Sequence, residues 1–344
     1  RVGPLMSVEI KQHHCLQDLN SLALPAMAEY FCSASDIEES RQALTFARRL
    51  SLAVTPLGGG SNMVFAGDLP GLVLHLNLKG ISHRPSGQDQ VEVTFAAGEN
   101  WHQMVKYCLT RGWYGLENLS LIPGNMGAAP IQNIGAYGVE LCDVFVSLEA
   151  LEIATGDVVI LDRQQCEFGY RDSIFKRAYR DRYLITAITL RLSTQPRVNI
   201  TYPALAEVLT AAAPTPQLVG QAVCRIRQQK LPDPEVLPNA GSFFKNPVVG
   251  ESVLASLHSN GSDAPYYRQV DGRYKVPAAW LIDQCGFRGQ RRGLVGVHEH
   301  QALVLINYGG TGTDLLALAA EIQSAVIERF AIALEIEPRL YGLV

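Results

Sequence analysis

Residues 122–138 read IPGNMGAAPIQNIGAYG, a stretch with four glycines and no charged side chain. A second glycine-rich stretch, PLGGGSN, spans Pro56–Asn62 and follows a short apolar run at Leu52–Thr55. Successive glycine N–H groups can turn toward one anion because no Cβ blocks its approach. For PLGGGSN alone, a tight turn after a strand is an equally good explanation. For each half of residues 122–138 taken singly, a buried structural loop is the better one. Together they predict a cradle for a cofactor that carries phosphates and an uncharged, hydrogen-bonding ring system.

The common nucleotide-binding fingerprints do not provide this cradle. Neither GxGxxG nor GxxxxGK[ST] occurs in the sequence, so a Rossmann fingerprint and a P-loop are both excluded. A dinucleotide bound here would need another architecture.

The segments around the first glycine stretch are α/β in character. A helix is predicted over Ser35–Leu50, starting with a capping box in which Ser35 is the N-cap. Strands are predicted at Leu72–Leu76 and Val91–Ala96, and a helix at Asn100–Arg111 ends before a glycine.

From Val144 onward, strands joined by turn residues dominate, with a hairpin predicted at Thr155-Gly156-Asp157. The rigid segment Leu231-Pro232-Asp233-Pro234 is typical of a domain boundary. Beyond it we expect an amphipathic helix at Asp314–Phe330 and a last strand at Ile332–Ile336.

Composition excludes several classes of protein. Among the 344 residues, 47% are hydrophobic and 18% charged, which argues against disorder, and the net charge of −4 lacks the cationic surplus of a nucleic-acid binder. Membrane spans and secretory leaders are not evident, so a cytoplasmic protein is expected. The seven cysteines form no CxxC pair and the histidines no HExxH, so we expect reduced thiols and no metal.

Three short segments carry candidate reactive groups. In FGYRDS, Arg171 could clamp a carboxylate, although a structural pairing with Asp172 explains it more simply. In GSFFKNP, Ser242 lacks the GxSxG context of a serine hydrolase, and a capping role is the alternative. Glu335 and Glu337 would share one face of a strand, where simple solvation is the alternative.

Six motifs follow one another along the chain: PLGGGSN, IPGNMGAAPIQNIGAYG, FGYRDSIFK (168–176), KLPDPEVLPNAGSFFKNP (230–247), AAWLIDQCG (278–286) and the closing Glu-x-Glu. Taken together, they resemble the bacterial UDP-N-acetylenolpyruvoylglucosamine reductases, and the resemblance covers about Leu19–Leu340. A long insertion that contains Tyr202 resembles the substrate-capping loop of the type I branch.

The resemblance implies an α+β fold of three parts. An α/β subdomain and an α+β subdomain would form a vanillyl-alcohol-oxidase-like FAD-binding fold, and a third α+β domain would bind substrate. The corresponding bounds are 1–78 plus 332–344 for FAD-binding subdomain 1, 79–231 for FAD-binding subdomain 2, and 232–331 for the substrate-binding domain.

The resemblance also implies non-covalent FAD, NADPH as co-substrate and a role in peptidoglycan precursor synthesis. NADPH would reduce the flavin, and the enolpyruvyl ether of UDP-N-acetylglucosamine would then accept hydride from flavin N5 at C3 and a proton at C2. UDP-N-acetylmuramate would be the product. Small molecules are the only partners expected, with neither nucleic acid nor membrane, and the chain is expected to be a monomer.

Carried over residue by residue, the family motif makes Ser242 the proton donor to C2. Arg171 and a protonated Glu337 would stabilise the enolate intermediate. Glu337 is chosen because it keeps the family's spacing to Arg339, and Glu335 is the fallback.

The other positions carried over form two groups. The cofactor-binding residues are Pro56, Leu57, Gly58, Gly59, Gly60, Ser61, Asn62, Pro123, Gly124, Gly127, Ala128, Gln132, Asn133, Gly135, Ala136, Tyr137 and Gly138. The substrate-binding residues are Tyr170, Tyr202, Lys230, Asn246, Tyr267, Arg288 and Gln301. Arg288 stands where the family often has lysine. The arginine keeps the positive charge and adds a planar guanidinium group with several N–H donors.

Two alternatives stay open at this point. One is a flavin oxidase of the same fold that acts on a sugar alcohol. The other is a non-catalytic nucleotide-sugar sensor that retains the loops, against which the intact Arg171, Ser242 and Glu337 set argues.

Overall fold

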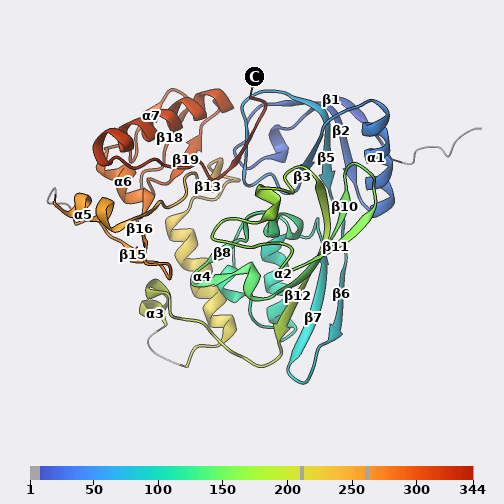
Figure 1. Cartoon of the computed structure of the whole chain (residues 1–344), viewed down its shortest axis with the longest axis horizontal. Coiled ribbons are helices and arrows are strands. Elements are labelled where there is room, and N and C mark those ends of the chain that lie inside the picture. The colour runs from blue at the N-terminus through green and yellow to red at the C-terminus, as the bar shows by residue number, and fades with distance from the viewer. Residues whose placement is uncertain (1–7, 210–212, 260–262, 344) are drawn as a thin grey trace, which may run out of the picture. The chain divides into compact units, whose positions relative to one another are not determined.

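The computed structural model describes residues 8–209, 213–259 and 263–343, drawn in Figure 1 in colours that follow the chain. The chain divides into two compact units. Unit 1 consists of residues 1–14, 28–60 and 69–229, and unit 2 of residues 15–27, 61–68 and 230–344. The three-part division expected from the sequence stays a prediction.

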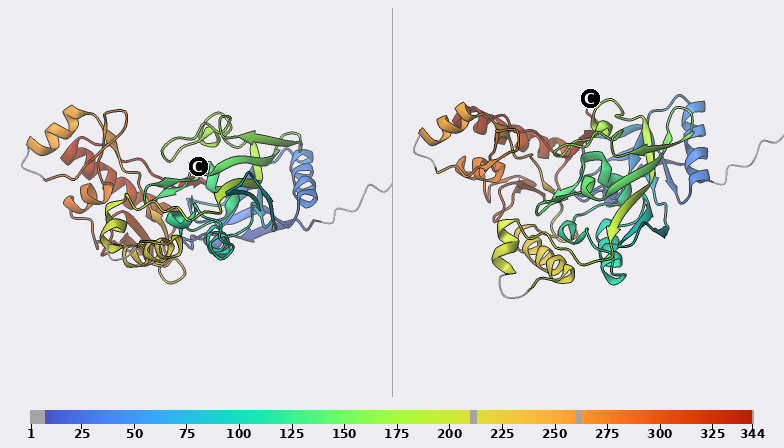
Figure 2. Two further views of the ribbon diagram at one scale, coloured as in Figure 1. Left: turned by 90° about the horizontal axis from the view of Figure 1, so that it is seen from below. Right: turned by 60° about the horizontal axis from the view of Figure 1, so that its bottom comes forward.

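Unit 1 contains a four-stranded sheet in the order β1-β2-β5-β3. β2 (Met27–Ala34) and β3 (Val54–Leu57) both pair in parallel with β5 (Leu69–Leu76), and β1 (Lys11–Cys15) forms one edge. Helix α1 (Ile37–Arg49) buries Ala43, Leu44 and Ala47 in a core shared with β2 and β5. Figure 2 shows this helix, in blue, beside the sheet.

The predicted start of α1 is wrong by one residue. Asp36 is the N-cap, because its backbone is extended and its carboxylate accepts the Glu39 N–H at 2.7 Å. Ser35 instead donates its N–H and hydroxyl to the Glu39 carboxylate, each at 2.7 Å. Aspartate and serine are both good caps, so sequence spacing alone did not separate them.

The second sheet of unit 1 is antiparallel, in the order β11-β10-β12-β7-β6. Helix α2 (Trp101–Thr110) contributes Trp101, Met104 and Val105 to the large core on this sheet. The predicted hairpin is confirmed, since Glu152 N–H donates to the Asp157 carbonyl at 2.8 Å across a turn whose Gly156 has φ +81°. The strands are β6 (Ile81–Pro85), β7 (Gln90–Ala96), β10 (Phe145–Glu152), β11 (Val158–Asp162) and β12 (Tyr183–Ser193).

The rest of unit 1 is helical or made of short hairpins. Helices α3 (Pro203–Val208) and α4 (Pro216–Lys230) share a small core that includes Leu205, Val219 and Val223. The glycine-rich block contains a short 3₁₀ helix (Met126–Gln132) followed by the hairpin of β8 (Gly135–Ala136) and β9 (Val139–Glu140).

Unit 2 is built on two small sheets, in the orders β13-β19-β18-β17 and β14-β16-β15. Its helices are α5 (Glu251–Ser259), α6 (Ala278–Gln284) and α7 (Gly312–Phe330). Helix α7 confirms the amphipathic helix predicted at Asp314–Phe330. The strands are β13 (Asn239–Ser242), β14 (Val248–Val249), β15 (Tyr267–Arg268), β16 (Tyr274–Lys275), β17 (Arg291–Arg292), β18 (Val295–Val297) and β19 (Val304–Asn307).

The predicted last strand at Ile332–Ile336 is wrong. Ile332 and Leu334 are buried, but the β pairing of the segment is an isolated bridge between Ile336 and Phe244. Pro338, which has no N–H to donate, follows that bridge. The regular strand is β20 (Arg339–Tyr341), which pairs in parallel with β4 (Met63–Phe65) of the same unit.

Candidate active site

The two predicted cofactor stretches meet in unit 1. The Cβ of an alanine at position 59 would lie 3.1 Å from the Gly124 Cα and 3.2 Å from Asn125 Oδ1. At position 58, an added Cβ would be 3.9 Å from the Ala128 Cβ. The loop after β3 and the loop before the Met126–Gln132 helix therefore touch through their backbones, as a cradle for one ligand requires.

The second loop is held against the end of β7. Gly127 N–H donates to the Ala97 carbonyl at 3.0 Å, and Met126 N–H donates to the Glu99 carbonyl at 2.8 Å. Trp101 N–H donates to the Gly124 carbonyl at 3.0 Å. These bonds fix the loop's position independently of any ligand.

Asn133 stabilises the next part of the block. It has a left-handed backbone (φ +46°) and is fully buried. Its Nδ2 donates to Glu140 Oε2 at 2.9 Å and to the Gly169 carbonyl at 3.1 Å, while its Oδ1 accepts the Cys142 N–H at 3.0 Å. The Asn133 side chain thus stabilises the loop through hydrogen bonds within the protein. A cofactor contact at this position would have to come from the Asn133 backbone.

Arg171 lies against the same block. Its Nη2 donates to the Gly135 carbonyl at 2.7 Å, and a Cβ at position 135 would be 3.1 Å from its Nη1. The Tyr170 ring centroid is 5.6 Å from the Arg171 Cζ. The neighbouring Asp172 carboxylate contacts Arg177 Nε at 3.3 Å. The Arg171 guanidinium therefore points toward the loop formed by Gly135–Gly138.

Tyr137, which belongs to that loop, meets Tyr202 edge to face, with ring centroids 5.2 Å apart at 76°. Burial raises the pKa of the Tyr137 phenol, which keeps it neutral. Tyr202 stands at the N-cap position of α3 and is 40% exposed.

Arg227 is a cation near this loop that sequence reasoning missed. Its Nε donates to the Leu121 carbonyl at 3.2 Å, and burial lowers the pKa of its guanidinium. It lies one helical turn before Lys230 on α4, so an Arg-x-x-Lys spacing was the available signal.

In unit 2, the chain brings Ser242 and Glu337 onto adjacent segments. Ser242 ends β13 opposite Val304 of β19. The next residue, Phe243, accepts the Glu337 N–H on its carbonyl at 2.9 Å. Gly241, with φ +67°, lies within β13 where the pairing with β19 shifts register between Asn239 and Ser242.

Glu335 has a different environment from Glu337. Lys245 donates its N–H to the Glu335 carbonyl at 2.9 Å and pairs its ammonium with the Glu335 carboxylate. The Glu335 side chain is 69% exposed, whereas Glu337 is half-buried. This difference favours Glu337 over the fallback.

The predicted substrate-binding residues are distributed over both units. Unit 1 carries Tyr170 and Tyr202, and unit 2 carries the others. Asn246 Oδ1 accepts the Ala278 N–H at 2.9 Å, and Gln301 Oε1 accepts the Leu303 N–H at 3.3 Å. The remaining side chains of this group are exposed: Lys230, Tyr267 and Arg288.

Arg288 has an acidic partner that was not predicted, since its Nε lies 2.9 Å from Asp283 Oδ1. Exposed ion pairs of this kind contribute little to stability. The contact instead restricts the orientation of the Arg288 guanidinium plane.

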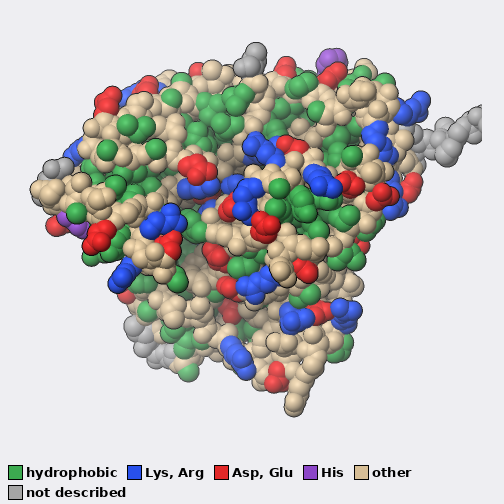
Figure 3. All heavy atoms as spheres, viewed as in Figure 1, with side chains coloured by type: hydrophobic (Ala, Val, Ile, Leu, Met, Phe, Trp, Pro, Cys, Tyr) green, Lys and Arg blue, Asp and Glu red, His purple; other side chains and the backbone are tan. Residues whose placement is uncertain are grey.

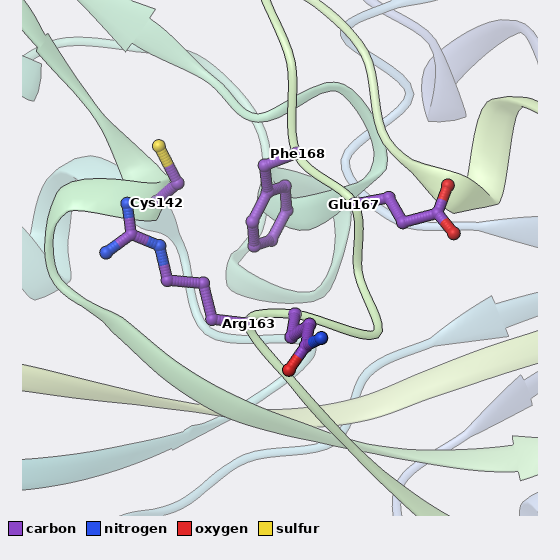
Figure 4. Close-up of a pocket in the computed structure, with 5 residues that line it drawn as sticks. Cys142, Arg163, Glu167 and Phe168 are labelled. Atoms are coloured by element: carbon purple, nitrogen blue, oxygen red, sulfur yellow. The ribbon is translucent and has the colours of Figure 1, made fainter.

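A separate pocket of about 460 Å³ in unit 1 is lined by Cys142, Arg163, Gln164, Glu167 and Phe168. Figure 4 shows the Arg163 guanidinium turned toward Cys142, and the Glu167 carboxylate turned away. None of the predicted site residues is among those that line it.

Charges of both signs are interspersed on the face drawn in Figure 3, consistent with the net charge of −4. Within the residues that the structure describes, none of the helices has the length and apolar character needed to cross a membrane.

Comparison with known proteins decides the family. A model described as an FAD binding domain matches residues 28–162, and one described as the C-terminal domain of UDP-N-acetylenolpyruvoylglucosamine reductase matches residues 232–341. The reductase of this name from Pseudomonas aeruginosa is 47% identical over 340 residues, which cover 98% of this chain and 100% of that protein. The chain belongs to the UDP-N-acetylenolpyruvoylglucosamine reductase family.

Another reductase of this family, from Amoebophilus asiaticus, is 44% identical over 334 residues, or 96% of this chain and 98% of that protein. The crystal structure of the reductase (MurB) from Thermus caldophilus has a TM-score of 0.64 at 22% identity, covering 97% of this chain and 98% of that chain. The predicted α+β fold is thereby confirmed.

Family membership confirms the predicted activity class. The chain is an oxidoreductase of peptidoglycan precursor synthesis, a UDP-N-acetylmuramate dehydrogenase with an FAD-binding domain and NADPH as co-substrate. Family membership therefore excludes the two alternative hypotheses, the sugar-alcohol oxidase and the non-catalytic sensor. The glycine contacts fit FAD, because residues without a Cβ at positions 59 and 124 let the two loops approach closely, and such glycine-rich backbone is suited to bind a pyrophosphate through its N–H groups.

Substituting Gly127 tests this cradle. A Cβ there would lie 2.5 Å from the Ala97 Cβ and 3.1 Å from its Cα, so the loop would have to move off the end of β7. We expect Gly127→Ala to destabilise the protein by about 1–3 kcal/mol and to lower the FAD content of the purified protein. Thermal unfolding and the ratio of flavin to protein absorbance measure both effects.

Gly250→Ala is the matched control, because an added Cβ at that position meets no atom within 4 Å. It should retain the parent's flavin content and melting temperature. Full flavin content in Gly127→Ala would contradict the assignment of this loop to FAD.

Proposed function

We propose that Ser242 donates the proton that completes the reduction of the enolpyruvyl group, and that Arg171 and Glu337 stabilise the enolate that precedes it. The observation that carries the proposal is the hydrogen bond from Glu337 N–H to the Phe243 carbonyl, at 2.9 Å. It holds the carboxyl-bearing segment beside the segment that ends in Ser242.

A serine hydroxyl is a weak acid, but its partner here is a strong base. An enolate next to a carboxylate takes a proton readily when the donor is within hydrogen-bonding reach. Ser242 is half-buried and its backbone is fixed on both sides, by pairing with Val304 and by the Phe243 N–H bond to the Leu303 carbonyl at 2.8 Å. The hydroxyl is therefore presented from a rigid strand end.

Arg171 would offset negative charge on the enolate oxygens. A guanidinium carries five N–H donors in a fixed plane, and it stays charged throughout the reaction. The Nη2 bond to the Gly135 carbonyl fixes the orientation of that plane. Preorganised donors of this kind stabilise developing charge without reorganising as the reaction proceeds.

Glu337, in its protonated form, would donate a hydrogen bond to an enolate oxygen. Its backbone is anchored by the Phe243 carbonyl, while Glu335 is occupied by Lys245 and faces solvent. Removing such a donor typically costs about 10²–10³ in rate.

FAD would be held by the loops of residues 56–62 and 123–138 and, when bound, would supply the hydride that C3 accepts from flavin N5. Tyr170, Tyr202, Lys230, Asn246, Tyr267, Arg288 and Gln301 would bind the nucleotide sugar and its diphosphate. The assignment to the type I branch rests on the Tyr202 insertion. We also propose that the enzyme is a monomer, that it is located in the cytoplasm and that it has the three-part division given above.

Anaerobic stopped-flow absorbance of the holoenzyme tests the assignment, with each half-reaction followed separately. NADPH should bleach the flavin, and the enolpyruvyl nucleotide should restore its colour without oxygen. Variants at Arg171, Ser242 and Glu337 should be slowed in the second half-reaction and near the parent in the first. Slowing of the first half-reaction alone would contradict the assigned roles.

A further inference from the structure

Asn118 is a buried polar residue that the proposed chemistry does not use. It lies in the 3₁₀ helix Glu117–Leu119, just before the block of residues 122–138, and is only 2% exposed. Buried amides are costly unless they are hydrogen-bonded, so the partners of this side chain indicate what it does.

Its amide nitrogen bonds to two segments that are far apart in sequence. Nδ2 donates to the Tyr137 carbonyl at 2.9 Å and to the Asn199 carbonyl at 2.8 Å. The first carbonyl belongs to the cofactor loop Gly135–Gly138, and the second to the segment Asn199–Tyr202 that leads into α3. A single NH₂ group has two N–H donors, so both are used.

The two segments also contact each other directly. Asn199 Nδ2 donates to the Gly138 carbonyl at 3.2 Å, and its Oδ1 accepts the Thr201 N–H at 3.1 Å. The Tyr202 ring, one residue further on, packs edge to face on Tyr137. The position of Tyr202 is thus set by contacts that begin at Asn118.

The 3₁₀ helix that carries Asn118 is firmly anchored. Trp101 Nε1 donates to the Leu119 carbonyl at 2.9 Å, and Arg227 Nε of α4 donates to the Leu121 carbonyl at 3.2 Å. His102 Nδ1 accepts the Leu121 N–H at 2.9 Å, and burial lowers the pKa of His102, which keeps the ring neutral. Asn118 therefore projects from a fixed point between two loops.

We propose that Asn118 is a positioning residue that couples the cofactor loop to the segment bearing Tyr202, and so sets the affinity for the nucleotide-sugar substrate. The inference rests on the proposed role of Tyr202 in substrate binding. Removing the amide leaves two part-buried carbonyls without this donor and weakens the link between the cofactor loop and the segment that bears Tyr202.

The first test is hydrogen exchange in the holoenzyme without substrate. In Asn118→Ala, the backbone N–H groups of residues 199–205 other than Pro203 should exchange about two- to tenfold faster, because the loss of one hydrogen bond changes the local opening equilibrium by about that factor. Thr186→Val is the matched control, since Thr186 is equally buried but bonds to the Glu149 carbonyl in the antiparallel sheet. Its exchange at 199–205 should equal the parent's.

The second test is a double-mutant cycle on substrate affinity. The Kd of the enolpyruvyl nucleotide for the oxidised holoenzyme, measured by calorimetry, should rise about tenfold in Asn118→Ala and should not rise further when Asn118→Ala is added to Tyr202→Ala. Flavin reduction by NADPH should stay within about twofold of the parent. Independent, multiplying effects of the two substitutions would overturn the inference.

The outcomes separate this inference from the proposed function. Unchanged exchange at 199–205 overturns the coupling and leaves the assignment of Tyr202 intact. Faster exchange, together with Tyr202→Ala binding substrate as tightly as the parent, supports the coupling of the loops and overturns the assignment of Tyr202. If Asn118→Ala does not fold, Asn199→Ala, which removes the bond to the Gly138 carbonyl from a partly exposed site, should show the same changes to a smaller extent.

Discussion

We expect the replacement of Ser242 with alanine to slow reoxidation of the reduced flavin by the enolpyruvyl nucleotide by about 10²–10⁴-fold, the usual contribution of a positioned proton donor. Flavin reduction by NADPH stays near the parent rate, because that half-reaction needs no proton from this hydroxyl. The measurement is anaerobic stopped-flow absorbance on enzyme reduced with one equivalent of NADPH.

Ser256→Ala is the matched control for this experiment. Ser256 belongs to unit 2, and its hydroxyl donates to the Ser252 carbonyl within α5. That variant should reoxidise at the parent rate. A Ser242→Ala enzyme that reoxidises within about threefold of the parent would rule out the hydroxyl as the proton source.

The replacement of Glu337 with alanine should lower the reoxidation rate by about 10²–10³-fold, because one preorganised donor to the enolate is lost. Glu337→Gln loses less, because an amide still offers a hydrogen-bond donor. The same stopped-flow measurement gives both rates, and the comparison of the two variants tests the protonated form of the carboxyl.

Glu335→Ala is the control that separates the two carboxylates. It removes an exposed ion pair with Lys245, and such pairs are worth about 0–1 kcal/mol, so its rate should stay within about fivefold of the parent. A large loss in Glu335→Ala with little loss in Glu337→Ala would reverse the assignment in favour of the fallback.

The parts of the site that could be predicted from sequence are those in which backbone conformation dictates the residue. Gly59 and Gly127 are needed because a Cβ would meet the facing backbone, and consecutive glycines are visible in a sequence. The segments of residues 56–60 and 124–128 accordingly meet as the motifs indicated.

Contacts between segments distant in sequence could not be predicted in the same way. Nothing around Asn118 indicates that its amide bonds to the carbonyls of Tyr137 and Asn199, since carbonyls carry no sequence signature. The strand predicted at Ile332–Ile336 does not form a ladder although Ile332 and Leu334 are buried, because a strand also needs a partner that offers its N–H and C=O groups.

The parallel pairing of β20 with β4 has a consequence for biosynthesis. Unit 2 draws on residues 15–27, 61–68 and 230–344, so its amino-terminal pieces leave the ribosome long before the strand that completes them. Closing such long loops slows folding, and the waiting segments expose apolar surface in the meantime. A fragment beginning at Lys230 would lack Val64 and Phe65, which are both fully buried in the whole chain. We therefore expect this unit to depend on chaperones during translation.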